Sequence, residues 1–534
     1  MTDVRPNILW ISLEDCSPRL GCYGDSLART PHLDRLAGEG CLYASAFSTS
    51  PVCAPARCAI ITGMYAASIG GQHMRTTCPD KAGGSVPPYE CVPPAFVKCF
   101  PEYLRAAGYF CSNNDKTDYQ FSPPFTMWDE IGREAHWRQR AAGSPFFAVF
   151  NLEGTHESGM WSRPDEVKTD PAAVTVPPYL VDAVETRLAI ARHYDNFEAV
   201  DQRVGELLWQ LEEDGLVENT VVMVWSDHGE GLPRGKRWPY DSGLRVPLIV
   251  RQPGCIAGGE ICQELISTID LGPTVLSLAG IPVPVHMQGR PFLGPQRQEF
   301  RTAVFSTQDR FDRTYVCART VRDARWRYLS RYPAQTLAPW TFYGNKHPAM
   351  RDLWNARLNG CLTAEQERFF LAGGPPEELY DLQNDPYEIR NLAGEPARQE
   401  TVRRLRALLE TWQRETGDLY AEPEDQMARR FWPDFEQPVT KPPCWVPYDR
   451  EYDGQGFPES GQISLTSPAL LQIHDLTQGA SIGYRLSSDP AHRWRLYTEP
   501  LALPPGSYEI EAKAIRIGYR ESPVQRLAVT VLEP

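Results

Sequence analysis

Short, almost uninterrupted apolar runs recur through the first half of this 534-residue chain. Three of them, at 7–13, 146–152 and 220–226, have the length and composition of strands that are buried on both faces of a parallel sheet. Segments with helical spacing of their apolar residues, such as 30–40 and 193–216, lie between the runs. Strands that alternate with helices predict an α/β sheet covered by helices on both faces.

Polar side chains with metal-binding chemistry follow these runs. Glu14 and Asp15 come directly after the first run, and Asp227 and His228 come directly after the third. Ligands of α/β sheets gather at the carboxyl ends of the strands, so both pairs are expected at one sheet edge. A single pair of adjacent carboxylates is more often a solvated turn. Two pairs at one edge, however, offer hard oxygen ligands for a divalent cation, and the sequence predicts a metal site there.

The segment 51–63, Pro-Val-Cys-Ala-Pro-Ala-Arg-Cys-Ala-Ile-Ile-Thr-Gly, predicts a nucleophile at the start of a helix. Cys53 in a first helical turn would lie among free backbone N–H groups and the positive end of the helix dipole, which suits an oxyanion such as sulfate or phosphate. Arg57, four residues on, returns to the same face and can hydrogen-bond the nucleophile or the anion. The alternative is a buried cysteine with an arginine cap, which a lone Cys-x-Pro-x-Arg would favour.

The Cys-x-Pro-x-Arg run, extended as far as Thr62-Gly63 and joined by the two polar pairs, resembles the signature of the sulfatase family. The resemblance implies an alkaline-phosphatase-like fold and conversion of the cysteine to a formylglycine, whose hydrated aldehyde is the nucleophile. It also implies one divalent cation, with ligands from Glu14, Asp15, Asp227, His228 and the modified Cys53. Two positions depart from the family, since Glu14 stands where Asp is usual and His228 where Asn is frequent. We expect calcium, with manganese second because it accepts an imidazole more readily.

Three further residues match positions that act on the sulfate group in sulfatases. Lys116 matches the lysine of the second family signature, although Asp115 and Asp118 replace the usual Gly and His. His156 ends a Thr-His run that faces the leaving group in the family, and Lys236 lies nine residues after Asp227. Without the resemblance, Lys116 would be a loop lysine and the histidine a structural one. The resemblance implies that His156, assisted by Lys116, protonates the departing group.

Four weaker candidates for the substrate pocket follow from position alone. His73 and Arg75 come directly after the nucleophile helix. Asp309 and Arg310 come after an expected strand at 303–306.

The chain is expected to contain four parts. Residues 1–374 form the catalytic α/β domain around a mostly parallel sheet, and residues 375–420 resemble the smaller C-terminal α+β subdomain of sulfatases. Residues 421–460 are rich in Pro, Trp and acidic groups, which is typical of an extended connector. Short alternating runs separated by turns at 461–534 predict an accessory antiparallel β-sandwich that supplies docking or oligomer contacts and no catalytic group.

Composition and the first residues limit the binding partners and the cellular compartment that we expect. A formal net charge of −14 argues against binding to nucleic acid or to anionic membranes. No apolar run approaches the roughly 20 residues that span a bilayer. The first residues lead straight into a strand without the apolar core of a signal peptide, which predicts a cytoplasmic protein whose 14 cysteines are reduced thiols. A homo-oligomer is compatible with this composition.

Three functions remain on the sequence alone. The first is a sulfatase that hydrolyses a sulfate ester or sulfamate of a sulfated sugar or small organic sulfate, with a formylglycine-generating enzyme as its partner; its segments look closest to bacterial relatives of heparan N-sulfatase. The second is a phosphonate monoester or phosphodiester hydrolase of the same superfamily. The third, a glycan-binding protein with a decayed site, is disfavoured because the nucleophile, metal and cation positions are all filled.

Overall fold

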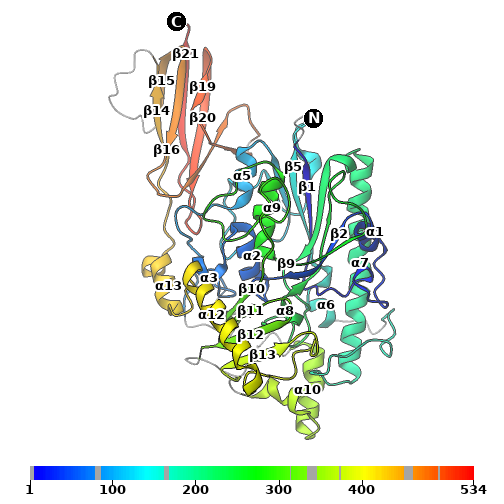
Figure 1. The fold of residues 1–534 in the computed structure, drawn as a ribbon. Helices are drawn as coiled ribbons and strands as arrows, with labels where there is room; N and C mark the ends of the chain where they lie inside the picture. Colours follow the sequence, from blue (N-terminus) through cyan, green and yellow to red (C-terminus); the bar gives the residue numbers. More distant parts are fainter. Residues whose placement is uncertain are drawn as a thin grey trace.

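A computed structural model describes residues 5–78, 86–161, 167–312, 314–332, 346–371, 374–449, 461–490 and 493–534. Within these residues the main body is a nine-stranded sheet of order β4-β3-β5-β1-β6-β8-β2-β7, in which β9 also pairs with β2 (Figure 1). The strands are β1 (Asn7–Leu13), β2 (Cys41–Phe47), β3 (Phe110–Asn114), β4 (Glu130–Ile131), β5 (Phe146–Leu152), β6 (Thr220–Ser226), β7 (Arg245–Val246), β8 (Leu248–Arg251) and β9 (Glu260–Ser267).

The centre of this sheet is parallel. β1 lies between β5 and β6 and runs parallel to both, with Leu13 opposite Leu152 on one side and Ser226 on the other. The pairs β3–β5, β3–β4 and β2–β9 are also parallel, whereas β8 and β7 pair antiparallel with their neighbours. The prediction of a mostly parallel sheet is confirmed. The in-register pairing brings the residues that follow β1 and β6 to the same edge.

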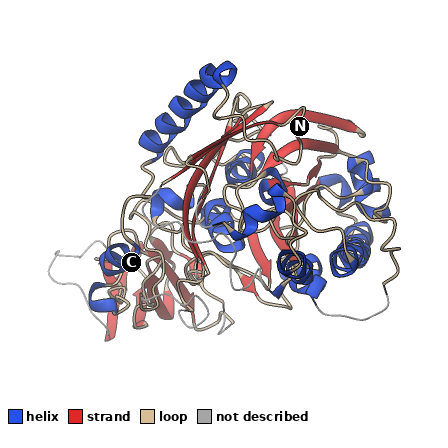
Figure 2. Cartoon of the chain, turned by 90° about the horizontal axis from the view of Figure 1, so that it is seen from below, coloured by secondary structure: helices blue, strands red, loops and turns tan. Residues whose placement is uncertain are grey.

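Helices cover both faces of the sheet, because alternate residues of each buried strand point to opposite sides (Figures 1 and 2). Ile8 and Trp10 of β1 belong to one core cluster, together with residues of α2 (Cys53–Thr62), α5 (Phe100–Ala106) and α9 (Leu271–Leu278). Leu9 and Ile11 belong to the other, together with α1 (Pro31–Gly38) and α7 (Val184–Glu213). Shorter or peripheral helices are α3 (Ala66–Ile69), α6 (Ser158–Trp161), α8 (Asp241–Leu244), α10 (Pro348–Leu358) and α11 (Ala364–Glu367).

Helix α7 begins well before the predicted segment at 193–216. Its first turn is held by Asp352 of α10, whose carboxylate accepts hydrogen bonds from the backbone N and the hydroxyl of Thr186 at 2.8 and 2.9 Å. This cap comes from a residue far along the chain, so the local pattern could not reveal it.

A second, smaller sheet packs beside the first. It is antiparallel, in the order β10 (Val304–Phe311), β11 (Thr314–Arg322), β12 (Trp326–Arg331) and β13 (Glu377–Asp381), and α12 (Gln399–Thr416) covers it (Figure 1). The predicted subdomain 375–420 supplies only β13 and α12. The other three strands, β10, β11 and β12, come from the predicted catalytic part. Because β12 pairs along its length with β13, a domain boundary near residue 375 would divide this sheet.

The segment predicted as an extended connector contains regular structure. It includes α13 (Glu424–Phe431), whose Met427, Ala428 and Phe431 belong to the same core cluster as β1 and α2. It also includes β14 (Cys444–Tyr448), which pairs with β16 of the C-terminal sandwich. Residues 450–460 lie outside the described residues. The helix thus belongs to the catalytic body and the strand to the sandwich.

The predicted β-sandwich is present (Figure 1). Its sheets have the orders β14-β16-β19 and β15-β21-β20-β17-β18, and the pair β15–β21 is parallel while the others are antiparallel. It docks on the catalytic body through side chains that donate to backbone carbonyls, as Lys98 does to Gly479 at 2.7 Å and Trp432 to Gly518 at 3.0 Å. The remaining strands are β15 (Gly461–Thr466), β16 (Ala469–His474), β17 (Ser481–Leu486), β18 (Arg495–Leu496), β19 (Leu501–Leu503), β20 (Gly506–Ile515) and β21 (Gln525–Leu532).

Two chain-wide features complete the description. All 14 cysteines lie in described residues, and each is a free thiol. Across the described ranges, the helices are either too short or too polar to cross a membrane.

Candidate active site

The predicted nucleophile opens a buried helix. Cys53 is the first residue of α2, Val52 before it is extended, and Gly63 ends the helix in the left-handed conformation with φ 66°. Every residue of α2 is buried. The Cys53 Sγ lies 3.2 Å from Glu14 Oε1 and 3.3 Å from His228 Nε2, so this side chain points at the predicted metal ligands. Burial raises the pKa of the Cys53 thiol well above its usual value, which keeps an unmodified thiol protonated.

The two polar pairs meet at the carboxyl edge of the sheet. Glu14 and Asp15 follow β1, while Asp227 and His228 follow the neighbouring β6. The backbone N–H of Asp15 donates to Asp227 Oδ1 at 3.3 Å, and His228 Nε2 lies 3.1 Å from Asp15 Oδ1. Asp15 adopts a left-handed conformation, φ 50°, which a non-glycine residue seldom does. All four side chains are at most 1% exposed.

The donor set fits a divalent cation. Donor atoms of Asp15, Cys53 and His228, and those of Glu14, Cys53 and Asp227, lie within 4.8 Å of one another in each group. Burial would raise the pKa of Glu14, but Lys116 and Arg57 outweigh it and hold that pKa well below its usual range. Burial is likewise outweighed at Asp15, whose pKa Lys236 holds well below its usual range. Both carboxylates are therefore ionised and can act as hard oxygen ligands.

Arg57 holds the ligands instead of contacting the nucleophile. Its Nε donates to Asp227 Oδ2 at 3.1 Å, and its NH2 donates to Glu14 Oε2 and Ser12 Oγ at 3.0 Å each. Its NH1 donates to Asn151 Oδ1 at 2.8 Å. Arg57 was predicted to hydrogen-bond the nucleophile or the anion, and the structure instead joins it to Glu14 and Asp227. Its guanidinium donates to all four partners, so Arg57 fixes the positions of the Glu14 and Asp227 carboxylates.

Two lysines neutralise the opposite side of the carboxylates. Lys116 Nζ lies 2.6 Å from Glu14 Oε1 and 3.3 Å from Asp118. Lys236 Nζ lies 2.9 Å from both oxygens of Asp15. Burial would lower the pKa of each ammonium, but Glu14 and Asp15 respectively raise it well above its usual value. Both lysines stay charged at the wall of the cavity.

His156 ends the short turn after β5 and lies near the same carboxylates. Its Nδ1 accepts the backbone N–H of Ser158 at 3.3 Å and lies 2.8 Å from the Ser158 hydroxyl. Burial, and then Lys236, lower the pKa of His156, so the ring is neutral at neutral pH. Since Nδ1 accepts a backbone N–H, the single ring proton is on Nε2. Glu14, Asp15 and His156 form a third group of donors within 4.8 Å of one another.

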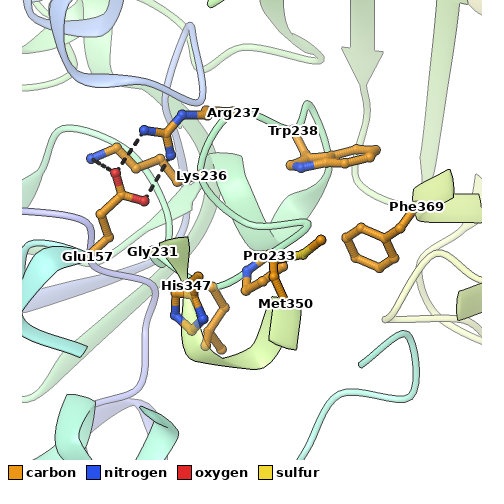
Figure 3. Close-up of a pocket in the computed structure, with 10 residues that line it drawn as sticks. Glu157, Gly231, Pro233, Lys236, Arg237, Trp238, His347, Met350 and Phe369 are labelled. Carbon is orange, nitrogen blue, oxygen red and sulfur yellow. Dashed lines mark hydrogen bonds and ion pairs between the residues drawn. The ribbon is translucent and has the colours of Figure 1, made fainter. Parts of the chain in front are cut away.

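A chain of buried ion pairs, which sequence reasoning missed, continues from this site. Glu157 pairs with Arg237 through two contacts of 2.8 Å and lies 3.6 Å from Lys236, as Figure 3 shows. Arg237 Nε in turn pairs with Asp312 at 2.8 Å. The backbone N–H of Glu157 donates to Asp15 Oδ2 at 2.7 Å, which connects these ion pairs to the predicted metal ligands. Glu157 and Arg237 directly follow His156 and Lys236 in sequence, and this adjacency could have indicated that they belong to the site. No local sequence pattern indicates Asp312.

A cavity of about 590 Å³ opens above the site. Cys53, Lys116, His156 and Lys236 line it, together with Arg75 from the weaker candidates. Polar residues of three segments complete its wall, among them Glu90, Thr117, Asp118, Gln120, Ser122 and Glu153.

The other three weak candidates do not line this cavity. His73 is buried, and its Nδ1 accepts the backbone N–H of Arg310 at 3.3 Å. Arg310 pairs with Glu424 of α13 at 2.5 Å, and Asp309 pairs with Arg319 at 3.1 Å. Burial lowers the pKa of His73 to about 4 and raises that of Asp309 to about 6. These residues join β10 to α13 and to the loop after α3, which is a structural task.

Comparisons with known proteins agree with this geometry. A family model described as Sulfatase matches residues 6–119 and 110–281. An ulvan-active sulfatase of Formosa agariphila is 37% identical, and the match covers 99% of this chain and 92% of that protein. This chain belongs to the sulfatase family. It is a sulfuric ester hydrolase, and sulfatases generally use a formylglycine and a divalent metal.

The relationship to heparan N-sulfatase is also confirmed. A model for the C-terminal part of N-sulphoglucosamine sulphohydrolase matches residues 229–355. The human N-sulphoglucosamine sulphohydrolase is 27% identical over 78% of this chain and 91% of that protein. The matched range begins just after His228 and includes Lys236 and three strands of the small antiparallel sheet, β10, β11 and β12.

Solved structures confirm the sulfatase fold. A 2-O glycosaminoglycan sulfatase superposes with a TM-score of 0.59 at 19% identity, covering 78% of this chain and 94% of the other. The phosphonate monoester hydrolase of Silicibacter pomeroyi superposes with a TM-score of 0.57 at 19% identity, covering 78% of this chain and 97% of the other. Such low identity shows the shared fold alone.

Proposed function

We propose that this sulfatase removes sulfate from a sulfated polysaccharide or its oligosaccharides, ulvan being the first candidate. The observation that carries the proposal is the cavity above Cys53, whose volume of about 590 Å³ lies in the range of small-molecule sites. Both cations and carboxylates lie on its wall. Such a wall suits a ligand that is both anionic and rich in hydroxyl groups, because carboxylates such as Glu90 and Asp118 can accept hydrogen bonds from sugar hydroxyls.

The relatives support a carbohydrate substrate. The protein with 37% identity is described as active on ulvan, and its match extends through the C-terminal sandwich because it covers 99% of this chain. The human relative is described as acting on N-sulphoglucosamine. Both are sulfated carbohydrates, so sulfated sugars are a better first choice than small aryl or alkyl sulfates.

The proposal assigns separate tasks to the charged residues. Lys116 and Lys236 are held at the cavity wall by Glu14 and Asp15, and their ammonium groups stabilise the sulfonyl oxygens of the bound ester. His156 holds its proton on Nε2, and this N–H donates a hydrogen bond to the departing oxygen or nitrogen, which stabilises the negative charge that develops there. Arg57 and Glu157 touch no substrate in this scheme. They fix the orientation of the carboxylates and of the Lys236 loop.

Two groups would be added to this chain in the active enzyme. A formylglycine at position 53, made by a formylglycine-generating enzyme, would supply a hydrated aldehyde as nucleophile, and a bound divalent cation would lower the pKa of its hydroxyl and balance charge on the sulfate. Glu14, Asp15, Asp227 and His228 would hold the cation. We propose calcium, since three of the four side chains offer oxygen. The imidazole of His228 makes manganese the second candidate.

The phosphonate monoester hydrolase function is the second candidate, and only the shared fold favours it. Kinetics of the metal-loaded, modified enzyme on 4-nitrophenyl sulfate and on 4-nitrophenyl phenylphosphonate separate the two, with release of sulfate from ulvan oligosaccharides as a third assay. We expect turnover of sulfates to exceed that of the phosphonate. A preference for the phosphonate, with no release of sulfate from any sugar, would contradict the proposal.

A further inference from the structure

Arg75 lies on the wall of the cavity, next to the nucleophile helix, and the mechanism above gives it no task. The preceding residue, Met74, packs in one buried cluster with Val52 and Ala54, the two neighbours of Cys53 in sequence. The backbone N–H of Met74 also donates to Arg310 O at 2.9 Å, which fixes this segment to β10. Arg75 is therefore held close to the reacting end of the cavity.

The Arg75 side chain belongs to the series of ion pairs that starts at the predicted metal ligands. Its Nε pairs with Asp312 at 2.5 Å, and the other Asp312 oxygen pairs with Arg237 at 2.8 Å. Arg237 pairs with Glu157, whose backbone N–H donates to Asp15. Asp312 is 1% exposed and Arg237 is 4% exposed, whereas the Arg75 side chain is 23% exposed. The chain thus runs from the protein interior to the cavity wall.

The backbone is strained at three consecutive members of this chain. Arg75, Asp312 and Arg237 have φ angles of 60°, 52° and 76°, in the left-handed region that residues with a side chain rarely adopt. Strained residues of this kind persist where the surroundings fix them, and they concentrate at active sites and ligand clamps. Asp312 stands in the two-residue turn between β10 and β11, where a positive φ is the ordinary conformation, so only Arg75 and Arg237 are strained without such a cause. Their surroundings therefore fix the backbone at both residues.

Arg75 differs from the two lysines that line the cavity. Lys116 and Lys236 contact Glu14 and Asp15, so their charges serve the end of the cavity where the sulfate reacts. Arg75 contacts neither of these carboxylates in the described structure, and its partner Asp312 belongs to the turn between β10 and β11. A guanidinium offers a planar fork that matches a carboxylate or a sulfate group and stays charged at all relevant pH values.

We propose that Arg75 binds a second anionic group of the sugar, a carboxylate or a second sulfate ester next to the sulfate that is removed, and that Asp312 is the positioning residue for Arg75. The inference rests on the proposed function and specifies the substrate class, a sulfated sugar that carries at least two anionic groups. Asp312 acts only through the guanidinium and touches no substrate.

The test is direct binding by calorimetry in a Cys53→Ala background, so that the probes are not consumed. One arm compares ulvan oligosaccharides before and after chemical reduction of their carboxyl groups to alcohols. The other compares D-glucosamine 2-N,6-O-disulfate with D-glucosamine 6-O-sulfate. In at least one arm the probe with the additional anion should bind about tenfold tighter or more, the range of a charged hydrogen bond. The arm that shows the preference tells carboxylate from sulfate.

The variants then assign the preference to Arg75. Arg75→Gln should reduce it to about one, and Asp312→Asn should reduce it in part, since the guanidinium remains but its anchor is weaker. Arg404→Gln is the matched control, because Arg404 is a half-exposed arginine of α12 that also pairs with one aspartate. It should keep the preference. Each preference is a ratio of two affinities in one variant, so a general loss of affinity cancels; if Arg75→Gln does not fold, Arg75→Lys and Asp312→Asn carry the test.

The outcomes distinguish a failure of the inference about Arg75 from a failure of the proposed function. No preference in either arm, while a sulfated sugar still binds, would overturn this inference and leave the proposed function intact. A preference that persists in both Arg75 and Asp312 variants would also overturn it. If none of the sulfated sugars binds, the proposed function fails and this inference fails with it.

Discussion

Replacement of Arg57 should lower the free energy of unfolding of the metal-free enzyme, and a bound divalent cation should restore part of it. The Arg57→Met variant keeps an unbranched side chain of similar length but removes all four hydrogen bonds that join α2 to Glu14, Asp227, Ser12 and Asn151. Arg57 is 3% exposed, and the two carboxylates are 1% and 0% exposed. Loss of one partner leaves buried charge without compensation, which costs about 3–5 kcal/mol. The metal-free catalytic body should lose about this much free energy of unfolding.

A divalent cation should restore part of the free energy of unfolding that Arg57→Met loses, because we expect the cation to bind the same carboxylates. A ligand that binds only the folded state stabilises that state in proportion to the logarithm of the ligand concentration. The assay is chemical denaturation of wild type and variant with chelator and at increasing calcium concentration. Arg404→Met is the control, since that exposed ion pair with Asp323 should contribute between zero and about 1 kcal/mol. A metal-free Arg57→Met protein within about 1 kcal/mol of wild type would refute the positioning task of Arg57.

Four further predictions follow from the same geometry. Cys53→Ala should lower turnover of an aryl sulfate by more than about a hundredfold while circular dichroism stays native, because several kcal/mol of transition-state stabilisation are lost. A chelator should abolish activity and so should Asp227→Ala; full activity in protein shown to be metal-free by elemental analysis would count against the metal site, and recovery with manganese but not calcium would show that His228 sets the ion. His347 caps α10 and burial lowers its pKa from 6.5 to about 4, so the unfolded chain takes up a proton here at higher pH than the folded one. This residue alone should lower the stability by about 3 kcal/mol as pH drops from 6.5 to 4, and buried His73 and His193, whose pKa values are also lowered to about 4, add to the fall. His347→Asn keeps the cap on Ala349 N and should flatten that part of the curve; an unchanged curve would exclude His347 as its source. Removal of residues 461–534 should leave hydrolysis of a small aryl sulfate largely unchanged but lower the thermal stability, since Trp432 then loses its acceptor at Gly518; a folded, metal-loaded and modified truncation with no turnover would show that the sandwich completes the site.

Much of the site follows from sequence because its residues lie at the ends of parallel strands. Glu14 follows β1 and Asp227 follows β6, and the in-register pairing of these strands is what brings the carboxylates together. The apolar runs and the motif around Cys53 are local patterns, so one segment at a time is enough to find them. Lys116, His156 and Lys236, for which the family resemblance implied roles at the sulfate group, lie on the wall of the cavity together with Cys53.

The rest depends on contacts between distant segments. Arg57 contacts Glu14 and Asp227 instead of Cys53 because its four acceptors come from β1, the residue after β1, β5 and the loop after β6, which no spacing within α2 can show. Asp312 joins the site from a hairpin far along the chain. Nearness to a motif was a poor guide to the pocket, since Arg75 lines the cavity while His73, two residues earlier, is buried against Arg310.

The predicted domain boundaries are also inexact, because strands from distant segments pair in one sheet. A strand pattern at 375–381 is visible locally, but its partner β12 comes from before residues 333–345, so the sequence gives no sign that both belong to one sheet. In the same way β14 precedes residues 450–460, and only its pairing with β16 assigns it to the sandwich.

The central claim is that hydrolysis of sulfate esters depends on a formylglycine at position 53. The most direct measurement is mass spectrometry of the tryptic peptide that contains residue 53, made on preparations with and without a co-produced formylglycine-generating enzyme and set against turnover of 4-nitrophenyl sulfate by the same preparations. The account predicts that turnover rises in proportion to the fraction of Cys53 converted and vanishes with it. Full turnover by protein in which the cysteine is unconverted, or none by fully converted and metal-loaded protein, would contradict it.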